Sequence, residues 1–572
     1  MTSRILAVQR GDAWTIGSPN SIQTAKPGSR YHAAVCGFIS NIPDLEKRYG
    51  APYPAGLTPA DRLVPLLHQG PDEVLERLKG NFAVLVTEQG TPRLWARRDC
   101  LGAHSLYLAQ GAGGEGWIVG NSAADVFRAS GHRFEEDPEY LAGYFSLHAQ
   151  PLEGRTPFRS VRSLLPGELL TIDGARVRRT RTPFPVATRP RWSSENEAVE
   201  QFRDLLDDSV RNCLATATDT AVMLSGGMDS APVAVLADRT LRSTDRRLLP
   251  ITWSLHEFPE ADETRWVDEV AERLSTPLLR LESSQLLPFT DPAAAPVNPE
   301  SPFFNPFRPL LNRCYRTAAE QGCSVILNGS DGDRIYPFYP LLYQGYLAHG
   351  EWGHLFEDLR GSLRRGGWRA IWNKTPLHEL LKQPLRRFVH RRPPRWLTAA
   401  TKAHWRDLPI WPPECLDHPV PRYAEQVCGR YITTDLCEEY FQACDSGVER
   451  REPFHNEELV AFMLAAPFSF SIRNHRTKWI MREAMKGLLP ESVRRKGRTG
   501  RLGSFYRAGK SAHRGAIESL LFKQRREWQR WVDADAVAET VADDRHNGPA
   551  ATMTERCIGY VNWLNYWQGG SG

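Results

Sequence analysis

The feature that most constrains this chain is the string from Ala221 to Ser230, which reads Ala-Val-Met-Leu-Ser-Gly-Gly-Met-Asp-Ser. Its apolar half predicts a buried strand, and the small residues that follow from Ala231 predict the start of a helix. The two glycines let the backbone turn with its N–H groups pointing inward, and the helix N-terminus adds partial positive charge. The string therefore predicts a pocket for a phosphate or pyrophosphate, formed by Leu224, Ser225, Gly226, Gly227 and Ser230.

The acidic residue of this string, Asp229, is well placed to hold the Mg²⁺ that accompanies a nucleotide, because Mg²⁺ prefers oxygen ligands. A Walker A loop is excluded, since no Gly-Lys-Ser/Thr follows the turn. The short Ser-Gly-Gly segment alone would also suit an ordinary strand-to-helix turn with serine caps. The full Ser-Gly-Gly-x-Asp-Ser string after an apolar run favours the nucleotide site.

Strands and helices alternate in the second part of the chain. We expect strands at 221–224, 249–253 and 323–328, and helices at 195–215, from 231 and at 262–274. This alternation predicts a parallel, helix-covered sheet that binds ligands at the carboxyl ends of its strands. Trp253 ends the second strand, so we expect it to line the nucleotide pocket.

A second polar segment, Asn328-Gly329-Ser330-Asp331-Gly332-Asp333, follows the strand at 323–328. It should lie at the same edge of the sheet as Asp229, with Gly329 close to the nucleotide. Carboxylates in this segment would complete a set of oxygen ligands for Mg²⁺ bridging ATP phosphates. A glycine-rich turn without chemistry is the alternative. The pairing with the upstream string favours a metal site at Asp229 and Asp333.

The first part of the chain has a different pattern. Short strands are expected at 33–39, 82–86 and 117–119, with a helical stretch at 59–78 between the first two. Gly111 to Gly116 matches Gly-x-Gly-x-x-Gly, but a strand follows it, so we expect a hairpin turn. A Pro- and Arg-rich stretch at 178–191 predicts the domain boundary, which gives domains 1–190 and 191–572.

The chain resembles the asparagine synthetase superfamily over nearly its whole length. The resemblance is carried by the 225–230 and 329–333 segments, by Glu449-Arg450-Arg451-Glu452-Pro453-Phe454, and by Lys478 to Ala484 with Leu489-Pro490. It implies an α/β protein with an N-terminal nucleophile (Ntn)-type αββα glutaminase-like domain. The second domain would be a parallel-sheet PP-loop ATP pyrophosphatase with mostly helical additions, which splits ATP into AMP and pyrophosphate.

Two departures from the family pattern shape the expected reaction. A family glutaminase needs cysteine directly after the initiator methionine, where its free α-amine acts as base, but this chain has Thr2. We therefore expect a glutaminase fold without glutaminase activity. Ser330 stands where asparagine synthetases carry glutamate and β-lactam synthetases carry tyrosine, and a serine hydroxyl can neither pair with an ammonium nor act as a base near neutral pH.

The family's catalytic lysine lies just past the Leu-Pro turn and stabilises negative charge on the adenylate and tetrahedral intermediate. Counted from Pro490, that position holds Arg498, and a slip of two residues would assign the role to Lys496. A guanidinium can supply charge but no removable proton. A solvated basic turn is the alternative. The resemblance adds Lys478 to the catalytic candidates.

These observations favour ATP-dependent amide formation within one substrate. We expect a lasso-peptide macrolactam cyclase that joins an Asp or Glu side chain to a peptide's N-terminal amine, with ATP and Mg²⁺ as cofactors. The irregular region 336–421 is expected to wall a substrate larger than an amino acid. The expected partners are a precursor peptide, or a small amino-acid-derived substrate, and a leader-peptide protease. The alternatives are a β-lactam synthetase-like or ammonia-dependent asparagine synthetase-like ligase, and a non-catalytic binding or regulatory homologue.

Composition excludes several other classes. A net charge of +5 over 572 residues gives no support for nucleic-acid binding. A basic and aromatic run at 385–396 is better explained as a linker or surface helix than as a nucleic-acid site. No run of about twenty apolar residues and no signal-peptide core are present, so we expect a cytoplasmic protein without membrane association.

Overall fold

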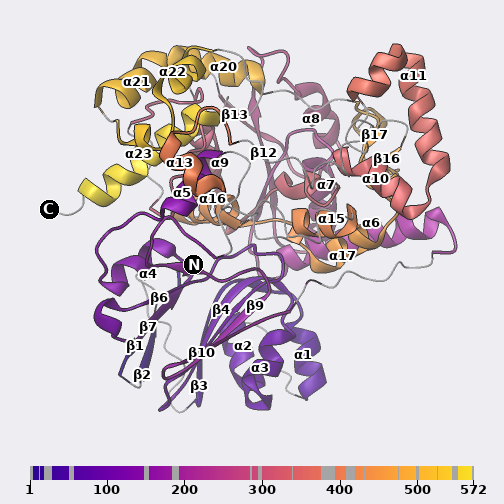
Figure 1. Ribbon diagram of the computed structural model, residues 1–572. Coiled ribbons are helices and arrows are strands. Elements are labelled where there is room, and N and C mark those ends of the chain that lie inside the picture. Colours follow the sequence, from indigo (N-terminus) through magenta and orange to yellow (C-terminus); the bar gives the residue numbers. More distant parts are fainter. Residues whose placement is uncertain are drawn as a thin grey trace.

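The computed structural model describes most of the chain and places two domains side by side (Figure 1). The described residues are 4–11, 13–17, 29–50, 57–146, 154–182, 184, 192–283, 286–293, 299–337, 339–374, 393–406, 419–428, 433–473, 476–497, 502–524, 526–543 and 552–569.

The N-terminal domain contains two five-stranded antiparallel sheets packed face to face. The first has the order β2 (Ala13–Gly17), β1 (Leu6–Arg10), β7 (Trp117–Gly120), β6 (Tyr107–Gln110) and β8 (Arg162–Ser163). The second has the order β10 (Arg176–Arg181), β9 (Glu168–Asp173), β5 (Arg93–Arg98), β4 (Gly80–Glu88) and β3 (Tyr31–Ile39). The helices on the two outer faces are α1 (Ile42–Tyr49), α2 (Pro59–Leu66), α3 (Pro71–Glu76), α4 (Ala123–Ser130) and α5 (Pro138–Ser146).

Strand β4 shows why the sequence forms these layers. Its Ala83 and Leu85 pack into the core between the sheets, whereas Phe82, Val84 and Val86 pack under the helices α1–α3. Successive side chains of a strand point to opposite faces, so an unbroken apolar run fills two cores at once. The expected αββα sandwich is confirmed.

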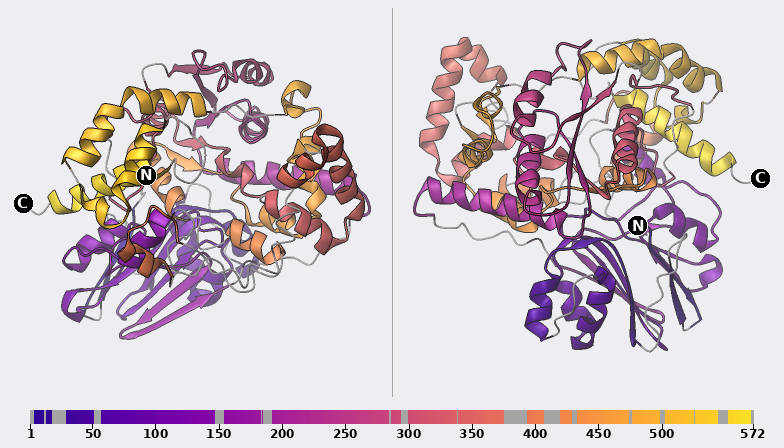
Figure 2. Two further views of the ribbon diagram at one scale, coloured as in Figure 1. Left: turned by 45° about the horizontal axis from the view of Figure 1, so that its top comes forward. Right: turned by 180° about the vertical axis from the view of Figure 1, so that it is seen from behind.

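The C-terminal domain is built on a parallel sheet whose helices cover both faces (Figure 2). Its order is β13 (Leu279–Glu282), β12 (Leu248–Ser254), β11 (Thr220–Met223), β14 (Val325–Leu327) and β15 (Glu449–Arg451). One face packs against α6 (Glu195–Leu214) and α7 (Ser230–Leu241), the other against α9 (Arg308–Glu320) and α16 (Thr433–Asp445). The expected parallel, helix-covered sheet is confirmed.

The rest of this domain is mostly helical. The additions are α8 (Thr264–Ala271), α10 (Tyr339–His349), α11 (Trp352–Lys374), α13 (Ala399–Arg406), α15 (Pro419–Cys428), α17 (Glu457–Ala465), the short pair β16 (Ile472–Arg473) and β17 (Arg476–Thr477), α18 (Trp479–Ala484), α19 (Glu491–Arg494), α20 (Gly503–Ala512), α21 (Arg514–Glu518), α22 (Ala534–Ala542) and α23 (Met553–Gly569). The last four share a hydrophobic core with α4 and α5 of the N-terminal domain.

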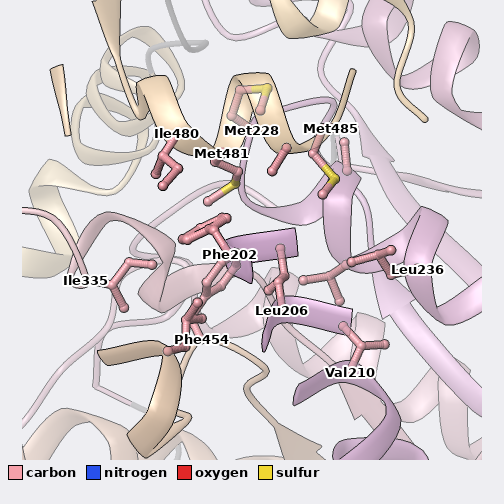
Figure 3. Packing of buried hydrophobic residues seen from close by; sticks show 14 of the residues in the cluster. Phe202, Leu206, Val210, Met228, Leu236, Ile335, Phe454, Ile480, Met481 and Met485 are labelled. Atoms are coloured by element: carbon pink, nitrogen blue, oxygen red, sulfur yellow. The ribbon is translucent and has the colours of Figure 1, made fainter. Parts of the chain in front are cut away.

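A hydrophobic cluster lies directly beneath the 225–230 segment (Figure 3). Phe202 and Leu206 from α6 meet Ile480 and Met481 from α18 in this cluster, and Met228 reaches it from the segment itself. Met228 is only 4% exposed, so it anchors the loop to the core. This packing ties the loop to the same core as α6 and α18.

Some element boundaries differ from expectation. The helix expected over 59–78 is split into α2 and α3, because Gly70 takes φ +121° and Pro71 begins the next helix. The helix expected at 262–274 is shorter, running from Thr264 to Ala271. Gly111 to Gly116 connects the antiparallel strands β6 and β7, as expected for a hairpin. Most of the basic run at 385–396 lies outside the described residues. Within the described ranges, every helix is too short or too polar to cross a membrane.

Candidate active site

The loop between β11 and α7 forms the floor of the candidate site. Leu224 still follows the sheet, since its N–H donates to the carbonyl of Ile251 on β12 at 2.8 Å. The hydroxyl of Ser230 then receives a hydrogen bond from the Ser225 amide at 3.0 Å and lies 2.9 Å from the Ser225 hydroxyl. These bonds close the loop around its own backbone, as the sequence predicts for an anion-binding turn.

Two glycines are required by close packing around this loop. Gly226 has φ +65°, and a Cβ there would lie 2.9 Å from the amide nitrogen of Val267 on α8. A Cβ on Gly332 would overlap the Asp229 carboxylate. The segment that follows β14 can therefore approach Asp229 only because glycine stands at position 332.

A lysine joins the two carboxylates that the sequence assigns to a metal. The ammonium of Lys478 lies 2.6 Å from both carboxylate oxygens of Asp229 and 2.6 Å from Oδ1 of Asp333. Burial raises the pKa of the Asp229 carboxyl above its ordinary value, and the charge of Lys478 opposes that rise. Lys478 has φ +60°, a strained backbone for a lysine, which aims its side chain at the loop.

A pocket of about 310 Å³ opens above the carboxyl ends of β11, β12 and β14. This volume falls within the usual range for small-molecule sites. The residues of the sequence prediction that line it are Leu224, Ser225, Asp229, Ser230, Trp253 and Gly329. The structure thus brings together segments that are about a hundred residues apart in the chain.

Other lining residues were not anticipated from the sequence. Asn305 and Phe307 come from the turn before α9, Glu439 from α16, and Leu502 from the residue before α20. These residues belong to no sequence motif. Each lies on an ordinary helix or in the turn before one, so the sequence pattern gives no indication of a ligand. The walls expected from region 336–421 contribute none of the described lining residues, and 375–392 and 407–418 lie outside the description.

Lys496 lies behind the loop rather than in the pocket. Its ammonium contacts Oε1 of Glu263 at 2.5 Å, the carbonyl oxygen of Gly226 at 3.4 Å and the ring of Trp266 at 4.0 Å. The ammonium is paired with a carboxylate, and its contact with Gly226 supports the loop from behind. Arg498 and Thr2 lie outside the described residues, so their assigned roles stay predictions.

Ser330 lines the pocket but is bound within its own segment. Its hydroxyl donates to Oδ1 of Asn328 at 2.7 Å, and its amide donates to the same atom at 2.9 Å. The Asp331 side chain lies outside the described residues. Serine therefore shapes the turn instead of presenting a base or a charge to a ligand.

The carboxylates of Asp229 and Asp333 are suited to hold one cation between them. Both lie within 2.6 Å of a single ammonium nitrogen, so their oxygens converge on one point. Oxygen donors from two carboxylates match the preference of Mg²⁺. Among the described residues, no cluster of three or more His, Cys, Asp or Glu side chains offers an alternative metal site.

The fold and this loop define an ATP pyrophosphatase-type domain joined to a glutamine amidotransferase-type domain. The Asparagine synthase family model matches residues 201–568, and the Glutamine amidotransferase domain model matches 24–183. The chain belongs to the asparagine synthase family. It is accordingly an ATP-dependent carbon–nitrogen ligase that forms AMP and pyrophosphate.

Relatives in two bacteria match this chain across both domains over about four fifths of its length. Asparagine synthetase [glutamine-hydrolyzing] 3 of Bacillus subtilis is 22% identical over 486 residues, which cover 82% of this chain and 74% of the relative. A putative asparagine synthetase [glutamine-hydrolyzing] of Mycobacterium tuberculosis is 23% identical over 506 residues, covering 81% of this chain and 72% of the relative.

Proposed function

We propose that this ligase activates a side-chain carboxylate as an acyl-adenylate and joins it to an amine of the same molecule. The substrate we favour is a precursor peptide whose Asp or Glu side chain is joined to its own N-terminal amine, as in lasso-peptide macrolactam cyclases. The observation that carries the proposal is Ser330, a neutral residue tied to Asn328 at a position where family enzymes for small amino acids carry glutamate or tyrosine.

The shape and lining of the pocket support this choice. Phe307, Leu310 and Leu311 form an apolar part of the pocket lining. A peptide can bury apolar side chains against such a lining, whereas free aspartate cannot. Thr2, at the position where a family glutaminase has its nucleophilic cysteine, favours a reaction that does not use ammonia from glutamine.

In this proposal each part of the site has a task. The backbone of the Ser225–Ser230 loop and the start of α7 bind the ATP phosphates that leave as pyrophosphate. Mg²⁺, held by Asp229 and Asp333, would neutralise phosphate charge. Lys478 lies beside both carboxylates and supplies positive charge next to the phosphates. Arg498 is assigned to the developing oxyanion.

The test is product analysis with purified full-length protein, ATP, MgCl₂ and synthetic peptides. Each peptide has a free N-terminal amine and a single Asp or Glu at a different position. We expect AMP and pyrophosphate, together with a peptide product that has lost one water and resists Edman degradation.

A matched series separates the competing functions. The same peptides with acetylated N-termini should exchange pyrophosphate into ATP but form no cyclic product. Asparagine formation from aspartate and ammonium chloride, with no peptide product, would replace the proposal by the asparagine synthetase-like reaction. Release of ADP, or no turnover with any of these substrates, would contradict it.

A further inference from the structure

Helix α16 connects the two domains at the ligand pocket. Its Glu439 lines the pocket, whereas the next two residues, Tyr440 and Phe441, belong to the hydrophobic core between the two sheets of the N-terminal domain. Adjacent side chains of this one helix therefore contact different domains. Any shift of the N-terminal domain relative to this helix would move Glu439.

Glu439 is held from behind by a buried arginine. Its Oε2 accepts a hydrogen bond from Nη1 of Arg450, whose side chain is 2% exposed and also contacts Glu452. These three side chains together carry one net negative charge. The Glu439 side chain keeps 22% exposure, and Oε1 has a long contact of 3.5 Å with Asn305 at the pocket wall.

The charges that line the pocket come from two residues of the described part of the chain, Asp229 and Glu439. Asp229 shares Lys478 with Asp333 and is assigned to the metal, whereas Glu439 shares Arg450 with Glu452. Glu439 is therefore the lining carboxylate that is left to receive a positively charged part of the substrate. The apolar wall around it, which includes Phe307 and Leu310, would strengthen that pairing by excluding water.

The contacts that Tyr440 makes with the N-terminal domain are neutral and buried. The Cys36 thiol donates to the hydroxyl of Tyr440 at 3.5 Å, and the Tyr440 ring stacks edge-on against His104 with centroids 4.5 Å apart. Burial lowers the pKa of His104 to about 4 and raises that of Tyr440 well above its usual value. His104 and Tyr440 therefore stay uncharged near neutral pH, and the contact between the domains depends on packing rather than on charge.

We propose that Glu439 binds the attacking amine of the substrate and accepts its proton, and that the N-terminal domain positions Glu439 by holding Tyr440. This inference rests on the proposed intramolecular amide formation. The amine arrives as an ammonium and gives one proton to the Glu439 carboxylate. Its lone pair then forms the C–N bond, the acyl C–O bond to AMP breaks with AMP keeping the electron pair, and the second nitrogen proton goes to water.

Hydroxylamine separates this role from carboxylate activation. Hydroxylamine is already a neutral nucleophile near pH 7, so it traps an acyl-adenylate as a hydroxamate without needing Glu439. We expect Glu439→Gln to lower cyclic-peptide formation about 10²-fold or more while hydroxamate formation is retained. Glu439→Asp should recover part of the cyclisation, and Glu320→Gln, an exposed carboxylate of α9, is the matched control.

The positioning role of Tyr440 has its own variants. Tyr440→Ala should lower the ratio of cyclic peptide to hydroxamate, whereas Tyr440→Phe keeps the ring and should preserve it. Thermal melts report whether either variant is folded.

Each outcome decides the matter. An equal loss of both products in folded Glu439→Gln would assign it a structural role, and unchanged cyclisation would exclude it from the chemistry. An unchanged product ratio in Tyr440→Ala would overturn the positioning role. If wild type forms neither cyclic peptide nor hydroxamate with any peptide, it is the proposed function that fails.

Discussion

Lys478 and Asp229 are 249 residues apart in the chain, yet the ammonium of one lies 2.6 Å from both carboxylate oxygens of the other. Lys478 directly precedes α18, and Asp229 directly precedes α7. The hydrophobic cluster shared by α6 and α18 fixes this distance (Figure 3). The pair therefore connects the phosphate loop to the helical part of the domain.

The first prediction concerns the two aspartates. Asp229→Asn and Asp333→Asn should each lower turnover by about 10²-fold or more, because each removes a charged ligand from a bridging metal site. Steady-state rates of pyrophosphate release at several MgCl₂ concentrations provide the measurement. Asp173→Asn, an exposed residue of β9, is the control. Full activity of either variant at saturating Mg²⁺ would show that the metal assignment is wrong.

Replacement of Lys478 should have opposite effects on metal binding and on turnover. Lys478→Met leaves the carboxylates of Asp229 and Asp333 without their shared cation, so Mg²⁺ should raise the Tm of this variant more than that of wild type. Turnover should fall, because the charge next to the phosphates is lost. Melting curves with and without MgCl₂ test this, with Lys486→Met as the control. An identical response to Mg²⁺ in variant and wild type would argue against a cation site here.

The basic residues after Pro490 should divide into one catalytic and one supporting role. Arg498→Ala should lower kcat about 10²-fold with KM for ATP little changed, since one donor to a developing oxyanion is worth on the order of 3 kcal/mol. Arg498→Lys should recover part of the loss, because charge matters more than fork geometry at a single oxygen.

Lys496→Ala is expected to act differently. It removes the cation that contacts the partly buried Glu263 behind the loop, so it should lower Tm and raise KM for ATP. Kinetics and melting curves of both variants distinguish the roles. A folded but inactive Lys496→Ala beside a nearly normal Arg498→Ala would mean that the register past Pro490 is shifted by two residues.

Gly332→Ala should inactivate the enzyme without unfolding it. The added Cβ would overlap the Asp229 carboxylate and displace it from Lys478 and from the metal position. Gly353→Ala, where an added Cβ meets nothing within 4 Å, should leave activity unchanged. Comparable activity of the two variants would contradict the observed proximity of Gly332 to Asp229.

Thr2 is predicted to have no catalytic role. Thr2→Ala should leave amide formation unchanged, and wild type should release no glutamate from glutamine, because the nucleophilic cysteine is replaced. A coupled glutamate dehydrogenase assay measures this. Glutamate release that disappears in Thr2→Ala would restore an amidotransferase function.

Local sequence patterns were sufficient to predict the phosphate loop and the sheet that carries it. An apolar run followed by Ser-Gly-Gly-x-Asp-Ser predicts a strand, a glycine turn and a helix start. All three are local properties of the sequence. The same kind of local signal placed Gly329 and Asp333 just after the strand expected at 323–328. The αββα layers also follow from alternation within single strands such as β4.

The pairing of the charged side chains could not be predicted in this way, because it depends on how distant segments pack. Lys478 and Lys496 are both catalytic candidates at the level of sequence, yet one contacts two carboxylates beside the pocket and the other is held by Glu263 behind the loop. Glu439 was not anticipated, because its position depends on α16 packing between two domains. Long-range packing sets these distances, and no local pattern encodes them.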